Sequence, residues 1–296
     1  MLANNARTLR EDVARRASGE KVLRHVPTGF DSIDSVYGGM RIGVATEIMA
    51  HTGDGKSAFM RQLAEGAARS GSGVLWFVGE DPEDATAERQ FAGDTGMSSS
   101  ELGRLNISQA QLSQIDLAVQ QAAPWAKRIL PVFDTMDVDD VLRTIDETTT
   151  IGGAPLQSVL VDYVQIFAPA NDLEAEIARL GLGMKDRSRE RKFAIGLGSQ
   201  VSNDVIKRGR DRFMQTHDAG LICPMIGDTE WCKRLEKVVK AVWAIVRPGR
   251  WLSEWGEDAR DDYAEFHVRK ANFGGMGWLP LKWDGPTTKF SDGDRT

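Results

Sequence analysis

The sequence predicts an α/β fold in which helices cover both faces of a mainly parallel central β-sheet. Two observations predict it. Apolar runs with the character of buried strands alternate with helical patterns along most of the 296 residues. In addition, one such run leads through a glycine-rich turn directly into a helical pattern, as in parallel α/β folds. At this length the chain could form one large domain or two small ones.

The expected elements follow one another at short spacing. A charged helical arm at residues 6–16 precedes turns at 26–30 and 38–39. Short apolar runs predict the strands, helical periodicity predicts the helices, and the polar end of the chain predicts a disordered tail. The strands are expected at 44–50, 74–78, 129–133, 158–161, 193–197, 238–246 and 264–268, with a hairpin at 278–283; the helices at 138–145, 173–192 and over most of 91–128; and the tail after residue 286.

The clearest motif is the turn at residues 50–58, which reads A-H-T-G-D-G-K-S-A. A strand, a glycine loop and a helix form a P-loop, whose backbone N–H groups and helix N-terminus bind phosphates. Lys56 is expected to bridge the β- and γ-phosphates of a nucleoside triphosphate, and the Ser57 hydroxyl to bind Mg²⁺. Ala50 stands where the general pattern has its first glycine. The expected nucleotide-binding residues are Thr52, Gly53, Asp54, Gly55, Lys56, Ser57 and Ala58.

Three polar residues stand at the carboxyl ends of expected strands, where open α/β sheets bind their ligands. Asp162 follows the strand 158–161 and is expected to hold Mg²⁺, although an acid there can also be a helix cap. Glu80 follows 74–78 and is either a general base for the attacking water or a surface acid that starts the next helix. Gln200 follows 193–197 and is either a γ-phosphate sensor or a solvated loop residue.

A basic run comes after Gln200. It predicts a flexible loop at residues 201–212, with Phe213 beside it. Basic side chains next to an aromatic residue are typical of sequence-independent binding to a nucleic-acid backbone. The alternative is a solvated surface run. The net charge of −6 shows that the whole chain is not a basic nucleic-acid-binding domain. The candidate DNA-binding residues are Lys207, Arg208, Arg210 and Arg212.

Composition excludes other classes. No apolar run approaches the ~20 residues that span a bilayer, and the N-terminus has no secretory h-region. Cys223 and Cys232 form neither a disulfide framework nor a zinc pattern, so we expect a reducing, cytoplasmic setting without a membrane. Six of the eight tryptophans lie after residue 230, where we expect them to pack the last strands, although one could stack on a base.

Several stretches together resemble the DnaB-type hexameric replicative helicases, which are RecA-like ATPases. They are V-P-T-G-F-D-S-I-D (26–34), A-H-T-G-D-G-K-S (50–57), F-V-G-E-D-P (77–82), V-D-Y-V-Q-I-F (161–167) and G-S-Q-V-S (198–202). The family's P-loop also commonly starts with alanine. The resemblance implies a RecA-like P-loop NTPase domain, ATP and Mg²⁺ as ligands, and catalytic roles for Glu80, Lys56 and Gln200. It also implies a ring-forming, ATP-dependent helicase on single-stranded DNA, a homo-hexamer, and a primase or helicase loader as partner.

The segment R-K-A-N-F-G-G (269–275) resembles the family's stretch that reaches the neighbouring subunit's nucleotide. Lys270 matches the family's lysine and is the fourth catalytic candidate. Asn272 stands where the family has its arginine finger, and Arg269 could substitute for it. Such fingers are worth ~10³–10⁵ in turnover, so this difference bears on the ATPase rate and not on nucleotide binding.

The resemblance also suggests a division of the chain. Residues 1–21 would match the linker helix that docks on the next subunit, 22–285 the ATPase domain, and 286–296 a disordered tail. The family's separate N-terminal domain has no counterpart, which suggests a compact phage or plasmid enzyme. Two other functions stay open. One is a filament-forming RecA-like recombinase ATPase, and the other is a nucleotide-switched assembly or loading factor.

Overall fold

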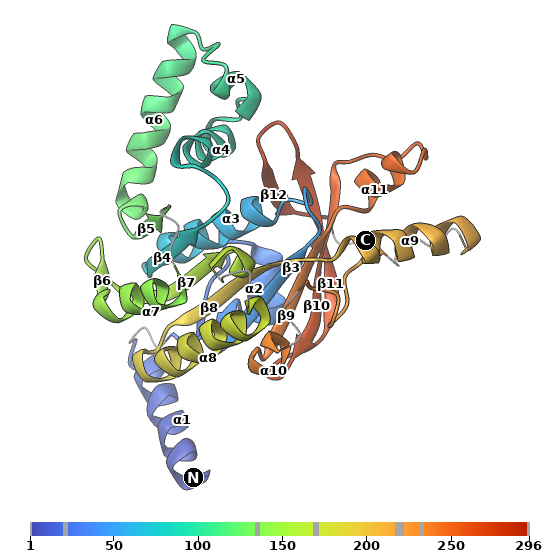
Figure 1. The fold of residues 1–296 in the computed structure, drawn as a ribbon. Coiled ribbons are helices and arrows are strands. Elements are labelled where there is room, and N and C mark those ends of the chain that lie inside the picture. Colours follow the sequence, from blue (N-terminus) through green and yellow to red (C-terminus); the bar gives the residue numbers. More distant parts are fainter. Residues whose placement is uncertain are drawn as a thin grey trace.

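The computed structural model describes residues 2–19, 23–133, 137–167, 172–216, 222–230 and 234–294 (Figure 1). Parts of two expectations lie outside the described residues. The expected domain boundaries fall partly on residues 20–22 and 295–296, and the cysteine interpretation falls partly on Cys232. The strands are β1 (His25–Val26), β2 (Met40–Arg41), β3 (Ala45–Ala50), β4 (Gly73–Val78), β5 (Ile129–Val132), β6 (Thr150–Ile151), β7 (Ala154–Asp162), β8 (Ala194–Gln200), β9 (Ala241–Val246), β10 (Tyr263–Ala271), β11 (Gly277–Asp284) and β12 (Lys289–Asp292).

A mainly parallel central sheet is confirmed. Within the described residues, ten strands form this sheet in the order β12-β11-β10-β9-β3-β8-β7-β4-β5, with β6 paired to β7. The strands from β9 to β5 in this order run parallel to one another. Strands β10, β11 and β12 extend the sheet antiparallel on the side of β9. The short strands β1 and β2 form a separate antiparallel pair.

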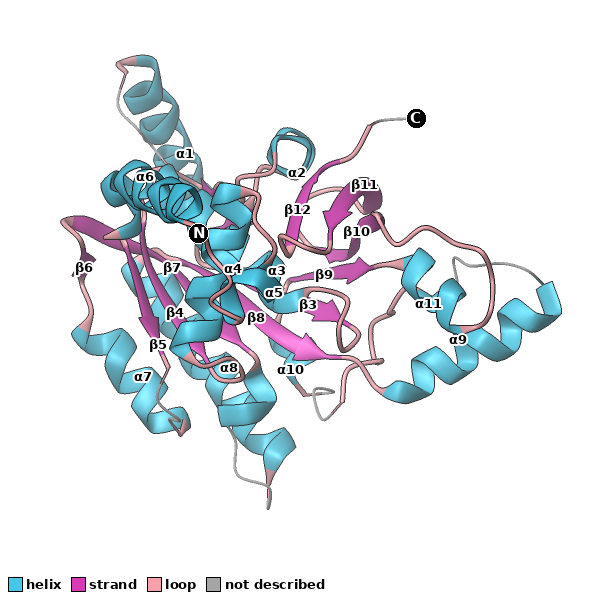
Figure 2. Cartoon of the chain, turned by 90° about the horizontal axis from the view of Figure 1, so that it is seen from above, coloured by secondary structure: helices cyan, strands magenta, loops and turns pink. Residues whose placement is uncertain are grey.

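Helices cover both faces of the sheet, as expected. They are α1 (Leu2–Ala17), α2 (Asp31–Tyr37), α3 (Lys56–Arg69), α4 (Glu83–Thr95), α5 (Ser99–Gly103), α6 (Gln109–Ala126), α7 (Val138–Glu147), α8 (Leu173–Arg191), α9 (Asn203–Thr216), α10 (Leu235–Val238) and α11 (Pro248–Glu254), with a 3₁₀ turn η1 (Val164–Phe167). Helices α7, α8 and α10 pack on one face, and α2 and α3 on the other (Figure 2). Helices α4, α5 and α6 stand above the β4–β5 side of the sheet (Figure 1).

Local sequence explains these elements. Every residue of β3 and β4 is buried, because a parallel strand covered on both faces has no solvent side. In α7, the buried residues Val138, Val141 and Ile145 recur at helical spacing, so one apolar stripe faces the sheet. The Asp137 carboxylate accepts a hydrogen bond from the Asp140 N–H (2.9 Å) and caps the start of this helix.

Four expectations differ from the structure. The hairpin expected at 278–283 is instead the single strand β11, which reaches β12 through a turn at 285–288. The basic run after Gln200 is not a flexible loop but the helix α9, because residues 205, 209 and 213 place one buried stripe along it. The strand expected at 238–246 begins only at Ala241, since α10 occupies residues 235–238. The expected disordered tail is wrong for residues 286–294. Strand β12 pairs with β11 there, and Phe290 is buried. None of the described helices is both long and apolar enough to cross a membrane.

Candidate nucleotide-binding site

Strand β3 delivers the glycine-rich turn to the carboxyl edge of the sheet, and α3 begins at Lys56. Gly53 and Gly55 have φ values of +81° and +92°, a left-handed conformation that glycine adopts without strain. A β-carbon on Gly53 would collide with the Arg250 guanidinium, and one on Gly55 would lie 2.7 Å from the Phe290 ring. Backbone conformation therefore favours glycine at both positions, and at Gly55 the Phe290 ring also leaves no room for a side chain. The turn has the strand–loop–helix context of a P-loop.

A cavity of about 360 Å³ opens in front of the P-loop. The structure brings Thr52, Gly53, Gly55, Lys56, Ser57 and Ala58 to its wall, together with Glu80 and Gln200. Sequence reasoning missed other residues of the wall. These are Ala50, His51, Asp81, Arg89, Trp283 and Thr288.

Lys56 and Asp162 form a buried ion pair at the floor of the site. The Lys56 side chain is 8% exposed and that of Asp162 is 2% exposed, so each charge depends on the other for compensation. The Lys56 Nζ also lies 4.7 Å from the centroid of the Tyr163 ring. Burial, together with the charges of Glu80 and Asp162, raises the pKa of Tyr163 above its ordinary value. The expected juxtaposition of the P-loop with the end of β7 is therefore present.

The donor set fits Mg²⁺. The Asp162 carboxylate is one oxygen donor, and because its Oδ1 atom is paired with the Lys56 ammonium, a metal ion would bind there once Lys56 turns to the phosphates. The Ser57 hydroxyl at the start of α3 provides a second oxygen donor on the cavity wall. Oxygen ligands, completed by phosphate and water, are what Mg²⁺ prefers. Ser57 and Asp162 are thus the residues that would hold the ion.

Gln200 and Glu80 enter the cavity from neighbouring strand ends. The Gln200 side-chain amide donates a hydrogen bond to the Thr52 hydroxyl, which connects the end of β8 to the P-loop. Glu80 follows β4 and is exposed to the cavity. The next residue, Asp81, forms an ion pair with Arg89 on α4, which fixes the wall beside Glu80. A neutral amide and an exposed carboxylate therefore face the same space as the phosphate-binding turn.

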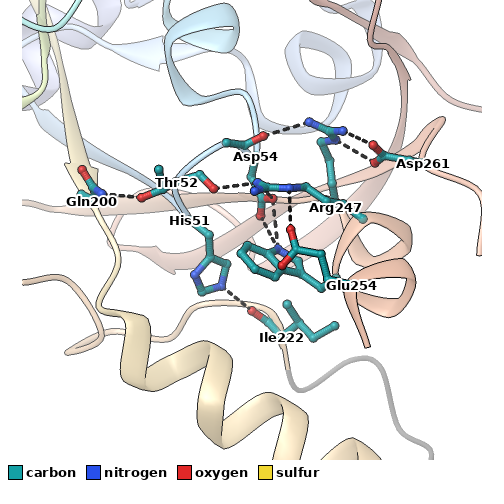
Figure 3. A network of polar contacts seen from close by, with 11 residues as sticks. His51, Thr52, Asp54, Gln200, Ile222, Arg247, Glu254 and Asp261 are labelled. Atoms are coloured by element: carbon teal, nitrogen blue, oxygen red, sulfur yellow. Dashed lines mark hydrogen bonds and ion pairs between the residues drawn. The ribbon is translucent and has the colours of Figure 1, made fainter. Parts of the chain in front are cut away.

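Asp54 differs from the other residues of the turn because its side chain is absent from the cavity wall. Its carboxylate is fully buried and faces α11 on the outer side of the loop (Figure 3). It accepts hydrogen bonds from Trp251 Nε1 at 3.1 and 3.2 Å and from Arg250 Nη1 at 3.2 Å. Burial raises the pKa of Asp54 to about 7, and the Trp251 hydrogen bond and the charge of Arg250 oppose this rise. The backbone N–H of Asp54 donates to the His51 carbonyl at 3.0 Å, so neither its side chain nor its N–H is free for phosphate in this structure.

The remaining predicted residues lie elsewhere. Lys270, on β10, does not line this cavity and donates a hydrogen bond to the Glu236 carbonyl at 2.7 Å. The basic residues of α9 are also outside it. Arg208 forms an ion pair with Asp228 (2.8 Å) and Lys207 forms one with Asp204 (3.2 Å), and all four basic residues are exposed on the helix. The structure therefore separates these candidates from the P-loop of the same chain.

The missed residues differ in how far the sequence could reveal them. Side chains of β11 alternate between a buried and an exposed side, and Trp283 is on the buried side. The sequence could therefore indicate that Trp283 is buried, but not that it lies at the nucleotide cavity. Arg89 lies in an ordinary helix, and Thr288 follows a turn in the expected tail. No local pattern marks either residue as part of a site.

Together, the parallel sheet, the P-loop and the acid at the end of β7 define a P-loop NTPase. The model of the family described as the DnaB-like helicase C terminal domain matches residues 25–292, and the chain belongs to this family.

Known relatives agree. The replicative DNA helicase DnaB of Rhodothermus marinus is 26% identical over 225 residues, which cover 69% of this chain and 22% of the relative. That of Pasteurella multocida (strain Pm70) is 23% identical over 290 residues, which cover 96% of this chain and 58% of the relative. The chain thus spans less than two thirds of each relative.

Solved structures show the same fold. A structure described as an ATPase domain superposes with a TM-score of 0.81 at 17% identity, and the match covers 99% of both chains. A DnaB-like replicative helicase, described with its interactions with primase, gives a TM-score of 0.78 at 18% identity. This match covers 97% of this chain and 66% of the other. The RecA-like α/β fold is therefore confirmed.

Proposed function

We propose that this chain is the motor domain of a ring-forming replicative helicase, which hydrolyses ATP to move along single-stranded DNA. The observation that carries the proposal is the buried ion pair between Asp162 and Lys56, whose lysine lines one cavity with Glu80 and Gln200. A phosphate-binding lysine, a metal-binding acid, a base and a γ-phosphate sensor are the parts that NTP hydrolysis requires. Family membership supports the same function.

Each residue has a distinct role in this proposal. Lys56 and the backbone N–H groups of the turn bind and orient the β- and γ-phosphates. Ser57 and Asp162 would hold Mg²⁺, which would supply charge neutralisation for the bound phosphates. Glu80 orients the attacking water and accepts its proton. The Gln200 amide, which now binds Thr52, exchanges this partner for the γ-phosphate and so reports its presence to the start of α9.

The basic residues of α9 are the proposed contact with DNA. Lys207, Arg210 and Arg212 are exposed and can neutralise phosphates, which would make binding sensitive to salt. Arg208 can join them only by leaving Asp228. Because α9 begins three residues after Gln200, a movement of Gln200 on loss of the γ-phosphate can be transmitted directly to the DNA-binding helix.

Assembly completes the proposed site. In a homo-hexameric ring, Lys270 would reach the nucleotide of the next subunit, which agrees with its position outside its own cavity. Arg269 would supply the positive charge that Asn272 lacks. The register of β10 shifts between residues 268 and 270, so the Arg269 side chain need not follow the regular alternation of side chains between the two faces of the strand. Helix α1 extends away from the sheet and would dock on the neighbour (Figure 1). A primase or a helicase loader is the proposed protein partner, and the cytoplasm is the proposed location.

Steady-state ATPase activity with and without single-stranded DNA tests this function. We expect DNA to stimulate the wild type and Lys56→Ala to abolish turnover. Because Lys56→Ala also leaves Asp162 unpaired, the exposed Glu80→Gln provides a second test. It should bind ATP normally but lose turnover by at least ~10². Glu83→Gln, an exposed acid on the adjacent helix, is the matched control.

The opposite result would be tight ATP binding with little turnover and no effect of DNA. That outcome contradicts a motor and favours a nucleotide-switched assembly factor. An open filament instead of a closed ring, seen by electron microscopy with ATP, would favour a recombinase-like ATPase.

A further inference from the structure

Helix α11 lies between two parts of the molecule that the proposed function assigns to different ligands. On one side it contacts the outer surface of the P-loop, and on the other it lies beside α9 (Figures 1 and 2). It does not line the nucleotide cavity. It is joined to the P-loop by hydrogen bonds and to α9 by an aromatic contact.

The contacts of α11 with the P-loop involve three consecutive residues of the turn (Figure 3). Arg250 Nη1 donates a hydrogen bond to the Thr52 carbonyl at 2.6 Å, and both Arg250 and Trp251 donate to the Asp54 carboxylate. Arg247, just before the helix, donates to the Gly53 carbonyl at 2.9 Å. None of the three donor residues lines the cavity, so these acceptors are held toward α11.

These contacts determine where the loop's donors point. In a trans peptide unit the C=O and N–H groups lie in one plane and point in opposite directions. Because Arg250 holds the Thr52 carbonyl outward, the N–H of Gly53 must point inward. Arg247 holds the Gly53 carbonyl in a similar way, but the N–H of that peptide unit, on Asp54, donates to the His51 carbonyl at 3.0 Å and is not free for phosphate. Helix α11 thus orients the Gly53 N–H, which is a candidate donor to phosphate.

The contact of α11 with α9 is made one turn later along the chain. Trp255 is the residue directly after α11, and its N–H donates to the Trp251 carbonyl at 3.0 Å, so it is tied to the last turn of the helix. The Trp255 ring packs against Phe213 of α9, with ring centroids 5.6 Å apart. Phe213 is 7% exposed and adjoins Arg212, so a movement of the basic helix also moves the Trp255 contact.

We propose that α11 couples the basic helix α9 to the P-loop, with Trp251 and Arg250 as positioning residues that act through Asp54 and the Thr52 carbonyl. The coupling rests on the proposed function, because it requires DNA to bind at α9. A shift of α9 on DNA is passed from Phe213 to Trp255, rotates α11, and changes the orientation of the Gly53 N–H. DNA then alters nucleotide affinity without touching the cavity.

The test is the affinity for a non-hydrolysable, fluorescent ATP analogue with and without a poly(dT) oligonucleotide. Trp251→Phe removes the donor to Asp54 but keeps an aromatic ring, and Phe213→Leu changes the contact at the far end. Trp278→Phe, an exposed tryptophan on β11, is the matched control. We expect DNA to change the dissociation constant by at least ~5-fold in the wild type and the control, and by less than ~2-fold in either variant.

A merely structural role would alter affinity without altering its dependence on DNA. The ratio of the two dissociation constants is therefore the decisive quantity, and thermal unfolding confirms that each variant is folded. If the wild type shows no DNA effect on nucleotide while both ligands bind, the proposed function fails and the coupling fails with it. If the wild type responds and both variants respond equally, only the coupling is overturned. With a shared route, the double variant should be no worse than either single variant.

Discussion

Glu47 offers the most direct test of the energetics of this fold, because it is an acid in the middle of the central strand β3. Its side chain is buried, and its Oε1 accepts a hydrogen bond from the Ser199 hydroxyl at 2.8 Å. Burial raises the pKa of Glu47 from 4.5 to about 7. The side chains of Ser199 and Thr229 and the charge of Lys270 oppose this rise, whereas the charge of Glu236 adds to it.

A carboxyl group whose pKa is raised on folding binds its proton more tightly in the folded state than in the unfolded state. Its contribution to stability is fully present below pH 4.5 and is lost as the pH rises through about 7. Since one pKa unit corresponds to about 1.36 kcal/mol, ionisation of Glu47 should cost the fold roughly 2–3 kcal/mol between pH 5 and pH 8.

Glu47→Gln removes the titration but keeps an oxygen that can accept from Ser199. We expect the free energy of unfolding of this variant, relative to the wild type, to rise by roughly 2–3 kcal/mol between pH 5 and pH 8. Urea denaturation, followed by tryptophan fluorescence without nucleotide, measures this difference. Asp54, whose pKa burial also raises to about 7, is present in both proteins, so its contribution cancels.

The exposed Glu101→Gln is the control, and its pH profile should follow that of the wild type. Parallel profiles for Glu47→Gln and the wild type would refute the reasoning. Such a result would mean that the buried carboxyl group keeps an ordinary pKa and that its burial carries no electrostatic cost.

Three further predictions concern the loop, the hairpin and the basic helix. Gly55→Ala should lose nucleotide binding in titrations and destabilise the chain by more than ~1 kcal/mol, since its φ is +92° and Phe290 leaves no room. Phe290→Ala should cost ~3–5 kcal/mol in urea denaturation, because this ring is 1% exposed and packs 4.5 Å from the Trp283 ring. Arg212→Ala should lower the salt dependence of single-stranded DNA binding by about 0.7 in log–log slope.

Each of these predictions has a clear opposite. Unchanged nucleotide affinity in Gly55→Ala would show that the loop relaxes around the new β-carbon. A loss below ~1 kcal/mol in Phe290→Ala would mean that β12 contributes little to the core. An unchanged salt slope in Arg212→Ala would place the DNA away from α9. Arg104→Ala, an exposed arginine outside α9, is the control for this measurement.

The central part of the fold could be predicted because its signals are local. The buried strand, the glycine turn and the helix of the P-loop are adjacent along the chain, so one window contains the whole motif. Asp162 and Gln200 come from distant strands, but parallel strands bring their carboxyl ends to one edge. A residue at a strand end therefore reaches the site through topology alone, and no knowledge of side-chain packing is needed.

Other parts could not be predicted, for identifiable reasons. The last strand is four residues long, which is too short for an alternation of apolar and polar residues to be recognised. In the sequence, its Phe290 is an isolated apolar residue in a polar segment. The stripe at residues 205, 209 and 213 was visible, but its middle member is Gly209 and charged residues stand between its members, which favoured a loop. Trp251 lies almost two hundred residues from the P-loop, and its target depends on tertiary packing alone.

Asp54 shows why a sequence motif predicts the role of a residue's backbone more reliably than the role of its side chain. The pattern requires the residue for its peptide group, but the fold turns its carboxylate outward into a buried position beside α11. A buried carboxylate is tolerated only while its donors remain, so removing Trp251 or Arg250 alone should cost more than replacing the carboxylate together with them. Variants of this loop must therefore be interpreted jointly with α11, because the phosphate-binding turn and the helix behind it form one energetic unit.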